Sequence, residues 1–554
     1  MKRTALTLLH FFILSLAAAF ADSVEPLLDG WVRHQSAPFN NACPYYIDNK
    51  VTTTTRCQVG CVATALESIV SYYGREVVLQ QPLKAWSNPA FAIKDVPAGT
   101  RIDTQCILPD YGDGTAASVG MSQADYRRSV EAVAQLSFIC GMAAHMNWGA
   151  SSSGADISDL VDPLHDSFGW KTARVVDSYY YTPTQWRELL KNELRNGRPI
   201  LYTGYTMGIG GHAFVVDGFN EEGLFHVNWG YGNSYYGNYY DITTLNPFVR
   251  HGEEQWNDVT QGFFCNQMAL FLSPDEVDLS MADATALDRT GQEIVIESAQ
   301  LQSPALAGKY TQLTVTLRNT SDKELCSPFE VFTNLTTESK ADLFKKGDYA
   351  ALFGVNLKPG ERTTVTAHCT FNRTGSRKLH ISPDDENVIY EKTISISTGS
   401  ADALTFAEPT VTFTPSIDAE GTTAYDATLS VGVTNTASQR SGSLVTYGLM
   451  DESEVHDGDA RHFDVVYLAA GKSTTSTVTY KGLEAGSTHL FIVRWPWDIR
   501  SQLTFTVPGL QTDLDTPSIL SPAVVDGGTY DLMGRRAGQA QRGLIIHAGR
   551  KTIR

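Results

Sequence analysis

The sequence has little cysteine, little positive charge and no long apolar run after its first residues. Eight cysteines in 554 residues are too few for a disulfide-stapled scaffold, although Cys326 and Cys369 could form one bridge. Lys and Arg number 43 against 61 Asp and Glu, which gives a net charge of -18. This balance argues against a nucleic-acid partner, because phosphate binding needs concentrated positive charge. No later stretch reaches the roughly 20 apolar residues that span a bilayer, so we expect a globular protein with no transmembrane segment.

The first 21 residues have the pattern of a secretory signal. Lys2 and Arg3 precede an apolar run that ends in Ala19-Phe20-Ala21, a small-x-small cleavage pattern. A membrane anchor is the alternative, but the run is short and no cysteine follows the cleavage point to carry a lipid. We predict that residues 1–21 are a signal peptide and that the mature protein is secreted or extracellular.

The length of the chain and the change in its residue pattern beyond Pro274 predict several domains. At about 150 residues per domain, a chain of this length suggests three or four. Residues 22–275 mix a helical pattern, glycine-rich loops and aromatic strands, whereas apolar and polar residues alternate beyond Pro274, as they do in antiparallel strands. We predict an α+β domain at 22–275, two all-β sandwich modules of immunoglobulin-like type at 285–398 and 403–510, and a small C-terminal β segment at 523–554. The two modules would be spacers or binding modules.

The residues after Cys61 predict a helix that begins at this cysteine. The apolar positions at helical spacing are 62, 65, 66, 69, 70 and 73. The unpaired N–H groups and the positive dipole end of a helix favour a thiolate, so we expect the thiol pKa to fall from about 8.5 toward neutrality. Such a thiol is suited to be a nucleophile. The alternatives are a buried or disulfide-bonded cysteine, or a metal ligand together with Cys57, although no matching second pair of ligands is present.

His212 stands between a glycine-rich loop, residues 208–211, and a strand-like run. Glycines let a substrate backbone approach, and a rigid strand holds an imidazole in place. The order of Cys61 and then His212, 151 positions later (212 minus 61), is the one expected of papain-type enzymes. Taken alone, a histidine before a strand is more often structural, so the two residues are considered together as a candidate catalytic pair.

Asn228 and Trp229 follow in the stretch 225–232, which is rich in aromatics and glycine. An asparagine amide can accept a hydrogen bond from an imidazole and so fix its tautomer, and a neighbouring tryptophan can shield that bond from water. We assign these roles to Asn228 and Trp229. The alternative for this stretch is a packed turn without a catalytic role.

Four separated motifs in the right order resemble the streptopain family of papain-like cysteine peptidases. They are Gly60-Cys61-Val62-Ala63-Thr64-Ala65, Gly210-Gly211-His212-Ala213-Phe214-Val215, Gln35-Ser36-Ala37-Pro38-Phe39-Asn40 and Trp148-Gly149-Ala150-Ser151-Ser152-Ser153-Gly154. The resemblance covers about residues 26–274. It implies a papain-like fold and a peptidase that acts on proteins or peptides and needs no metal or organic cofactor.

The resemblance also implies roles for further residues. Gln35 would supply part of the oxyanion hole, and Ser153, Gly154 and Gly211 would line the substrate cleft. Tyr231 stands where the family often has a second tryptophan, a departure that could alter the primed side of the cleft. Only 14 residues (22 through 35) separate the predicted signal cleavage site from Gln35, whereas the family has a long inhibitory propeptide there. We therefore expect no latency from an N-terminal prodomain.

The C-terminal segment resembles the sorting domain of type IX secretion substrates. The motifs that carry this resemblance are Tyr530-Asp531-Leu532-Met533-Gly534-Arg535, Gly543-Leu544-Ile545-Ile546 and Gly549-Arg550-Lys551. The resemblance implies a partner in the type IX secretion machinery and attachment to the outer cell surface. The alternative is one more β-hairpin with a basic tail.

Two other functions compete with that of a peptidase. In the first, the protein is a catalytically silent surface adhesin or binding protein on a peptidase scaffold. Intact Cys61, Gln35, His212 and Asn228 weigh against it, because a decaying site loses such residues first. In the second, the same Cys-His chemistry acts on another amide, such as a cell-wall crosslink.

Overall fold

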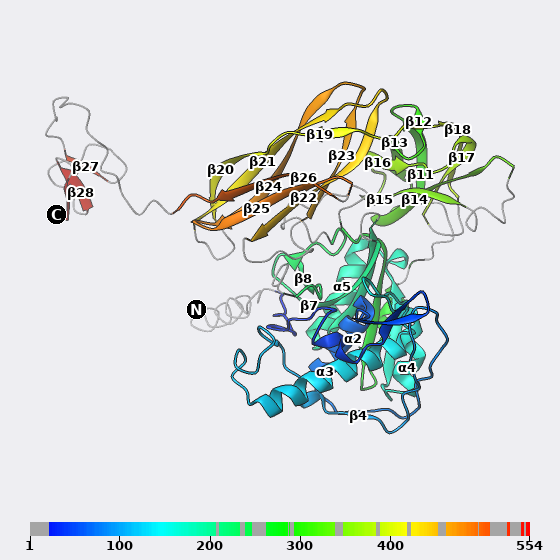
Figure 1. Cartoon of the computed structure of the whole chain (residues 1–554), viewed down its shortest axis with the longest axis vertical. Coiled ribbons are helices and arrows are strands. Elements are labelled where there is room, and N and C mark those ends of the chain that lie inside the picture. Colours follow the sequence, from blue (N-terminus) through cyan, green and yellow to red (C-terminus); the bar gives the residue numbers. More distant parts are fainter. Residues whose placement is uncertain are drawn as a thin grey trace, which may run out of the picture.

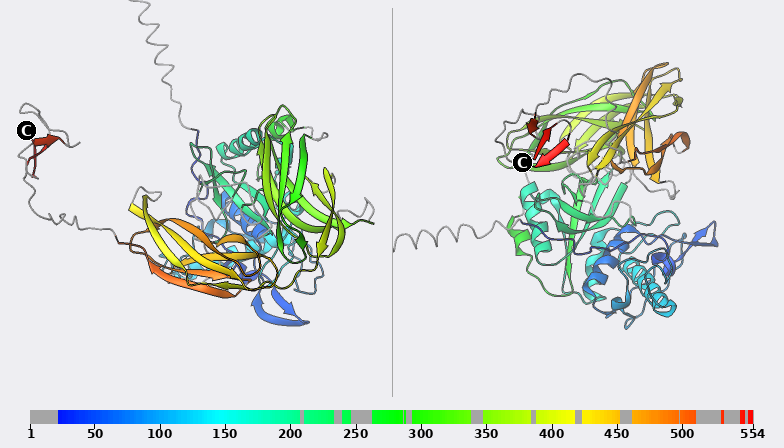
Figure 2. Two further views of the ribbon diagram at one scale, coloured as in Figure 1. Left: turned by 90° about the horizontal axis from the view of Figure 1, so that it is seen from above. Right: turned by 90° about the vertical axis from the view of Figure 1, so that its left-hand side faces the viewer.

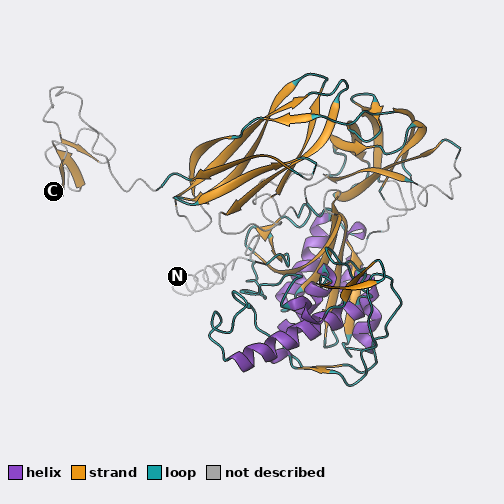
Figure 3. Cartoon of the chain, in the orientation of Figure 1, coloured by secondary structure: helices purple, strands orange, loops and turns teal. Residues whose placement is uncertain are grey.

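The N-terminal part of the protein is an α+β region, and β-sheets make up the remainder (Figures 1 and 3). The computed structural model describes residues 22–206, 210–232, 239–245, 262–285, 287, 293–337, 347–383, 388–417, 423–451, 461–496, 498–509, 529–531, 544–547 and 550–553. The predicted signal peptide and most of the predicted sorting segment lie outside these residues. No helix in the described ranges is both long enough and apolar enough to cross a membrane.

The α+β region consists of a six-stranded sheet and the helices that pack against it. The sheet has the strand order β5-β10-β6-β7-β8-β9. Its strands are β5 (Thr172–Asp177), β6 (Ile200–Thr206), β7 (Gly210–Phe219), β8 (Phe225–Asn228), β9 (Tyr239–Tyr240) and β10 (Cys265–Ser273). The α-helices are α2 (Cys61–Tyr73), α3 (Gln123–Ala143), α4 (Val161–Asp166), α5 (Pro183–Arg195) and α6 (Ser280–Thr285), and the short 3-10 helices are η1 (Phe39–Ala42), η2 (Thr104–Cys106), η3 (Ile157–Leu160) and η4 (Ser178–Tyr180). Two small hairpins pair β1 (Tyr45–Asp48) with β2 (Val51–Arg56) and β3 (Val77–Val78) with β4 (Arg101–Ile102).

The six-stranded sheet separates two hydrophobic cores. Alternate residues of β7 enter opposite cores, because side chains of a strand point alternately to the two faces. Ala213 and Val215 pack with α2 and α3 on one face. Phe214 and Val216 pack with α5 on the other. Strand β7 is therefore held from both sides, and its first residues are fixed relative to the start of α2.

The sequence explains where the two helices next to the sheet begin and end. Helix α2 buries almost its whole length and stops at Gly74, whose φ of 59° is the left-handed conformation that glycine adopts without strain. Helix α5 begins with a capping box in which the Thr182 hydroxyl accepts from the Gln185 N–H and the Gln185 side chain accepts from the Thr182 N–H. The predicted helix from Cys61 is confirmed.

Two further pairs of sheets follow, each pair around its own core (Figure 2). The first core runs from Leu287 to Ile396 and the second from Leu404 to Val507. The first pair has the strand orders β11-β13-β16 and β12-β18-β17-β14-β15, and the second has β19-β21-β20 with β24 beside β21, and β23-β22-β25-β26. The bounds are β11 (Ile294–Leu301), β12 (Ala305–Leu306), β13 (Tyr310–Asn319), β14 (Leu325–Leu335), β15 (Asp348–Leu357), β16 (Arg362–Thr370), β17 (Gly375–Ser382), β18 (Tyr390–Ser397), β19 (Leu404–Phe406), β20 (Thr410–Ile417), β21 (Thr423–Asn435), β22 (Ser441–Asp451), β23 (Arg461–Leu468), β24 (Ser473–Glu484), β25 (Thr488–Arg494) and β26 (Ile499–Thr506). The predicted alternation gives strands as expected, while the exact module boundaries stay a prediction.

A buried polar junction joins the two pairs of sheets. The side chain of Lys309 is 1% exposed, and its ammonium donates to Asp402 Oδ1 at 2.5 Å and to the Arg440 carbonyl at 2.8 Å. Arg440 in turn donates to the Tyr310 carbonyl at 3.0 Å and to the Thr311 hydroxyl at 2.8 Å. These contacts connect residues on both sides of the predicted linker, so the two β modules are in direct contact.

A small three-stranded sheet lies near the C-terminus. It has the order β27-β28-β29, with bounds Thr529–Asp531, Leu544–His547 and Arg550–Ile553. The three strands fall on the three motifs of the predicted sorting segment. This arrangement agrees with the expected small β segment, and the sorting role stays a prediction.

Candidate active site

Cys61 is the first residue of α2, and the backbone around it is shaped by a glycine. Gly60 has a φ of 90°, and a Cβ placed on it would lie 2.5 Å from the Met146 sulfur. A side chain at position 60 would therefore strain the backbone and collide with Met146. The glycine before the cysteine permits this sharp entry into the helix, and Cys61 remains partly exposed at its start.

The thiol of Cys61 experiences two opposing effects. Burial raises its pKa, while hydrogen bonds from the backbone N–H groups of Ala213, Val62 and Cys61 itself act to lower it. The net direction of the pKa shift is upward, so the predicted net lowering was wrong. The helix start does supply N–H donors, but the partial loss of hydration on burial of the thiol outweighs them.

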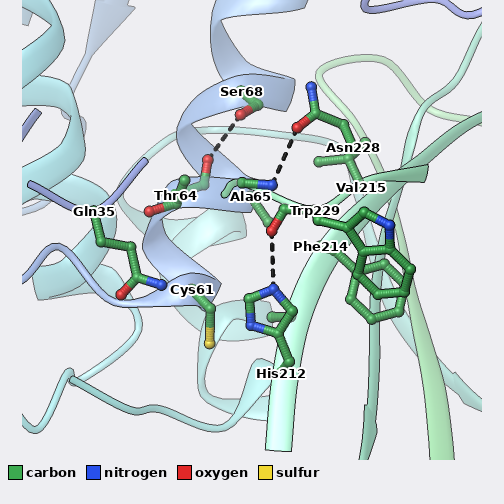
Figure 4. Close-up of a pocket in the computed structure, with 12 residues that line it drawn as sticks. Gln35, Cys61, Thr64, Ala65, Ser68, His212, Phe214, Val215, Asn228 and Trp229 are labelled. Carbon is green, nitrogen blue, oxygen red and sulfur yellow. Dashed lines mark hydrogen bonds between the residues drawn. The ribbon is translucent and has the colours of Figure 1, made fainter. Parts of the chain in front are cut away.

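His212 lies in β7 with its ring in the same pocket as Cys61 (Figure 4). The His212 Nε2 lies 2.9 Å from the carbonyl oxygen of Trp229. Because a carbonyl can only accept, Nε2 carries the proton in the neutral ring and Nδ1 has the free lone pair. Figure 4 shows this second ring nitrogen on the side of Cys61.

Four aromatic rings surround the imidazole of His212. Tyr231 stacks on it at 4.6 Å between ring centroids and an angle of 13°, and Trp229 lies nearly parallel at 6.3 Å. Phe263 and Phe214 complete the enclosure at 5.5 and 5.8 Å. This enclosure leaves His212 only 6% exposed, and burial lowers its pKa to about 4. Burial therefore disfavours the charged form of both His212 and Cys61 when each is taken alone.

Asn228 is placed differently from the prediction. Its side-chain nitrogen donates to the Trp31 carbonyl at 2.8 Å, and its oxygen accepts from the Gly230 N–H at 3.2 Å. The hydrogen bond that we expected between Asn228 and the imidazole is instead made by the Trp229 carbonyl. Asn228 lines the same pocket and holds the turn that presents this carbonyl. A backbone acceptor leaves no trace in residue identity, so the sequence could not show it.

Gln35 reaches the pocket from the N-terminal segment. Its backbone carbonyl accepts from the Val59 N–H at 3.0 Å, which ties this segment to the residues just before Cys61. Figure 4 shows the Gln35 side-chain amide beside the start of α2, with its nitrogen toward Cys61. The predicted neighbourhood of Gln35, Cys61 and His212 is thus present in one pocket.

The loop predicted to line the cleft is fixed through the hydroxyl of Ser153. This hydroxyl donates to the Gln58 carbonyl at 2.8 Å and accepts from the Gly149 N–H at 3.0 Å. Because these bonds occupy the Ser153 side chain, its part in any cleft would come from the backbone. Gly154 forms a backbone bridge with Asn147, and a Cβ placed on it would meet no other atom within 4 Å, so this face of the loop is open.

Gly211, the other predicted cleft residue, precedes His212 on β7. It is exposed, and a Cβ placed on it would lie 2.6 Å from the ring of Tyr205, its partner on β6. A residue with a side chain at position 211 would therefore have to displace the ring of Tyr205.

A buried ion pair connects α2 to the segment that carries Gln35. Arg33 Nε lies 2.8 Å from Glu67 Oε2, and both side chains are almost fully buried. The Arg33 guanidinium also donates to the carbonyls of Pro109 at 2.6 Å and Leu108 at 3.1 Å, and Ser71 donates to Glu67 at 2.8 Å. The sequence analysis did not single out this pair, because Arg33 and Glu67 are far apart along the chain and carry no motif of their own.

The other described cysteines are also free thiols. Cys57 and Cys43 are fully buried, and burial raises the pKa of Cys57 to about 11. Cys326 and Cys369 are not bridged: Cys369 is buried in the core of the first β module, and Cys326 is partly exposed on the other sheet of that module. Cys61, by contrast, lines a pocket together with His212.

The lowered pKa of His212 predicts acid sensitivity when the thiol is absent. In a Cys61→Ala protein, unfolded His212 would gain a proton near pH 6.5, but folded His212 would remain neutral to about pH 4. Between pH 6.5 and about pH 4 the unfolded state therefore binds more protons than the folded state. As the pH falls through this range, the free energy of unfolding should decrease by roughly 3 kcal/mol. Urea unfolding of Cys61→Ala and Cys61→Ala/His212→Asn at pH 7.0 and 4.5 measures the contribution of His212 to this pH dependence. An equal pH dependence of the two variants would contradict it.

A partly exposed thiol that faces the free ring nitrogen of a buried histidine is an arrangement typical of cysteine hydrolases. The Peptidase C10 family model matches residues 33–240, which contain all the predicted site residues. This match covers less than half of the chain, and it agrees with the resemblance seen in the motifs.

Two curated relatives are each similar to 42% of this chain. The thiol protease/hemagglutinin PrtT of Porphyromonas gingivalis is 26% identical over 234 residues, which are 42% of this chain and 25% of that protein. Streptopain of Streptococcus pyogenes is 25% identical over 248 residues, which are 42% of this chain and 59% of streptopain. The alignments thus span a quarter and about three fifths of these relatives.

Among solved structures, interpain A, a cysteine protease of Prevotella intermedia, matches at 29% identity in its active wild-type form. The match covers 45% of this chain and 94% of that structure, with a TM-score of 0.37. A fragment of prointerpain A matches at 28% identity over 47% of this chain and 74% of the fragment, with a TM-score of 0.36.

Proposed function

We propose that this protein is a secreted cysteine endopeptidase that hydrolyses peptide bonds through a thioester formed on Cys61. The observation that carries the proposal is the pairing in one pocket of Cys61, at the start of α2, with His212, whose Nε2 is bound to the Trp229 carbonyl. This bond leaves Nδ1 free to accept the thiol proton. The match of residues 33–240 to a family of cysteine peptidases supports the same chemistry.

The first half of the reaction forms the thioester. The thiol proton of Cys61 moves to His212 Nδ1, so that both charges appear together and stabilise each other in a pocket that disfavours either alone. The thiolate attacks the substrate carbonyl carbon. The oxyanion accepts hydrogen bonds from the Cys61 N–H and the Gln35 amide, and the carbon–nitrogen bond then breaks as His212 protonates the leaving amine.

The second half releases the acid. Water gives a proton to the neutral His212 and attacks the thioester carbonyl, whose oxyanion uses the same donors. Collapse of this intermediate breaks the carbon–sulfur bond and restores the thiol–imidazole pair. In this proposal Trp229 shields the imidazole bond, Asn228 positions the Trp229 carbonyl, and Gly211 with the backbone of Ser153 and Gly154 lines the cleft for the substrate backbone.

The location of the protein is part of the proposal. A signal peptide at residues 1–21 would direct export, and the segment 523–554 would direct passage through type IX secretion machinery to the cell surface. We propose that the two β modules are immunoglobulin-like sandwiches. They would then serve as spacers or binding modules between the catalytic region and the C-terminal sorting segment.

Titration of the thiol tests the proposed function. The epoxide inhibitor E-64 should modify one thiol per molecule, at Cys61, and abolish the degradation of casein in proportion to labelling, because this thiol shares its pocket with the His212 imidazole as a base. Peptide mass spectrometry locates the label, and casein degradation measures activity. Activity that persists after complete labelling, or a label on another cysteine, would reject the proposal.

A further inference from the structure

Strand β7, which carries the catalytic imidazole, has one residue more than β8 along the ladder that joins them. Val216 pairs with Val227, and the next pair is Gly218 with His226, so Asp217 is an extra residue between two pairs. Such an extra residue is a β-bulge, which bends the strand and shifts the register of every pair beyond it. The bulge therefore sets how β8 lies along the first half of β7.

This register decides which carbonyl meets His212. Val215 pairs with Asn228, and the carbonyl of the next residue, Trp229, lies 2.9 Å from His212 Nε2 (Figure 4). Without the bulge, the pairs at the far end of β7 would continue in step and place Asn228 opposite Val216. Trp229 would then move along β7 by one residue, about 3.3 Å, away from the imidazole.

The three oxygens of Asp217 all have hydrogen-bond partners. Its carbonyl accepts from the Leu27 N–H at 2.9 Å, Oδ2 accepts from the Leu28 N–H at 2.8 Å, and Oδ1 accepts from His226 Nδ1 at 2.6 Å. The side chains of Asp217 and His226 are 0% and 3% exposed. Because buried polar groups need partners, these bonds replace the ladder bonds that a bulge disrupts.

His226 connects the bulge to β8. Its bond to Asp217 runs from one strand to the other at the point where the register changes, two residues before Asn228. The ring of Tyr239, on β9, packs edge-on against the His226 ring at 5.3 Å between centroids. The His226 ring is therefore held from two sides.

The N-terminal segment supports the bulge as well. Val24 exchanges two backbone hydrogen bonds with Phe219, of 2.8 and 2.9 Å. Gly218 lies so close to this segment that a Cβ placed on it would be 2.8 Å from the Val24 carbonyl oxygen. The bulge is thus enclosed between β8 and the residues that precede Leu28.

We propose that Asp217 and His226 position His212 for the reaction, because their hydrogen bond keeps the register in which the Trp229 carbonyl meets Nε2. This inference rests on the proposed peptidase function and adds two positioning residues to it. Both residues lie apart from the residues that line the pocket of Cys61, so they act through the register of β7 and β8. When their bond is lost, Nε2 loses its acceptor, the tautomer is no longer fixed, and Nδ1 is less often available for the thiol proton.

The rate at which iodoacetamide alkylates Cys61 tests the inference, because this reaction uses the thiol–imidazole pair without the oxyanion hole. His226→Leu removes the donor to Asp217, and alkylation at pH 7 should slow about tenfold, part of the effect of a general base. In a His212→Ala protein the same substitution should leave the rate unchanged, since no imidazole remains to be positioned. Peptide mass spectrometry assigns the label to Cys61 in all four proteins.

Two further variants separate positioning from general stability. His226→Asn keeps a side-chain N–H near the place of Nδ1 and should restore alkylation to within about threefold of the wild-type rate. Tyr202→Phe is the control for a lost buried bond in the same sheet. The Tyr202 hydroxyl accepts from Trp186 Nε1 at 2.8 Å and donates to Gln267 at 3.0 Å, so its loss should lower stability and leave the alkylation rate unchanged.

Peptide hydrolysis gives a second measurement. In His226→Leu, kcat per site titrated with E-64 should fall about tenfold while KM stays the same, because the pair acts in the chemical step. Counting titrated sites removes any contribution from unfolded protein. If His226→Leu does not fold, Asp217→Asn takes its place, since an amide has one acceptor oxygen where the carboxylate uses two.

The results distinguish the inference from the proposed function. Equal alkylation rates in wild type and His226→Leu, or an equal slowing in the His212→Ala background, overturn the inference while the peptidase function stands. So does a His226→Asn protein as slow as His226→Leu. If E-64 fails to label Cys61 and no peptide is cleaved by the wild type, the peptidase function fails and the inference falls with it.

Discussion

Replacing Cys61 with alanine should reduce peptide hydrolysis at least about 10⁴-fold, because the proposed acyl intermediate forms on its sulfur. His212→Ala should cause a loss of similar size, since the thiol would then have no base within the pocket. The two residues act as one unit, so the double variant should be no slower than either single variant. Single-turnover and steady-state assays with one peptide measure all three.

Cys106→Ala is the matched control for the loss of a cysteine. Cys106 is also a partly exposed free thiol, but its sulfur lies 3.1 Å from the Asp103 carbonyl, away from the pocket. Its removal should leave kcat/KM unchanged. A Cys61→Ala protein that retains more than a few per cent of the wild-type rate would contradict the thioester mechanism.

Glu67→Ala should destabilise the α+β region by about 3–5 kcal/mol. The substitution leaves the guanidinium of Arg33 buried without its carboxylate, and an unpaired buried charge is costly. A loss of this size is a large part of the stability of a typical domain. The Gln35 segment should loosen as well, so activity should fall under conditions in which the protein remains folded.

Denaturant unfolding followed by tryptophan fluorescence measures this effect, because seven of the nine tryptophans lie at or before residue 256. Glu76→Ala is the control: it breaks an ion pair with Arg101 whose N···O distance is 2.6 Å but whose side chains are mostly exposed, and the midpoint should change little. Equal unfolding midpoints for the two variants would show that the buried Arg33–Glu67 pair contributes no more to stability than the exposed pair does.

The sequence predicted those parts of the fold in which periodicity and burial agree. Helix α2 follows from its apolar spacing, because the predicted positions pack into the core that this helix shares with α3 and β7. Strands β13 and β21 follow from strict alternation, since a period of two places every second residue in a core. For Cys61, Gln35 and His212, the motifs predicted a shared location that the pocket bears out.

The parts that could not be predicted depend on the backbone and on the shape of the site. The acceptor for His212 is the Trp229 carbonyl, which any residue at position 229 would supply. The thiol pKa depends on how completely the pocket excludes water, and one-dimensional spacing carries no such information. Tyr205 approaches Gly211 only through the register of β6 and β7, which the sequence leaves open.

The junction at Lys309 has a consequence for how the two β modules can be separated. A protein that ended between them would lack Asp402 and the Arg440 carbonyl, the two partners of the Lys309 ammonium, and water would take their place. The hydrogen bonds from Arg440 to Tyr310 and Thr311 would be lost as well. A cut at this point would therefore run through a network of polar contacts.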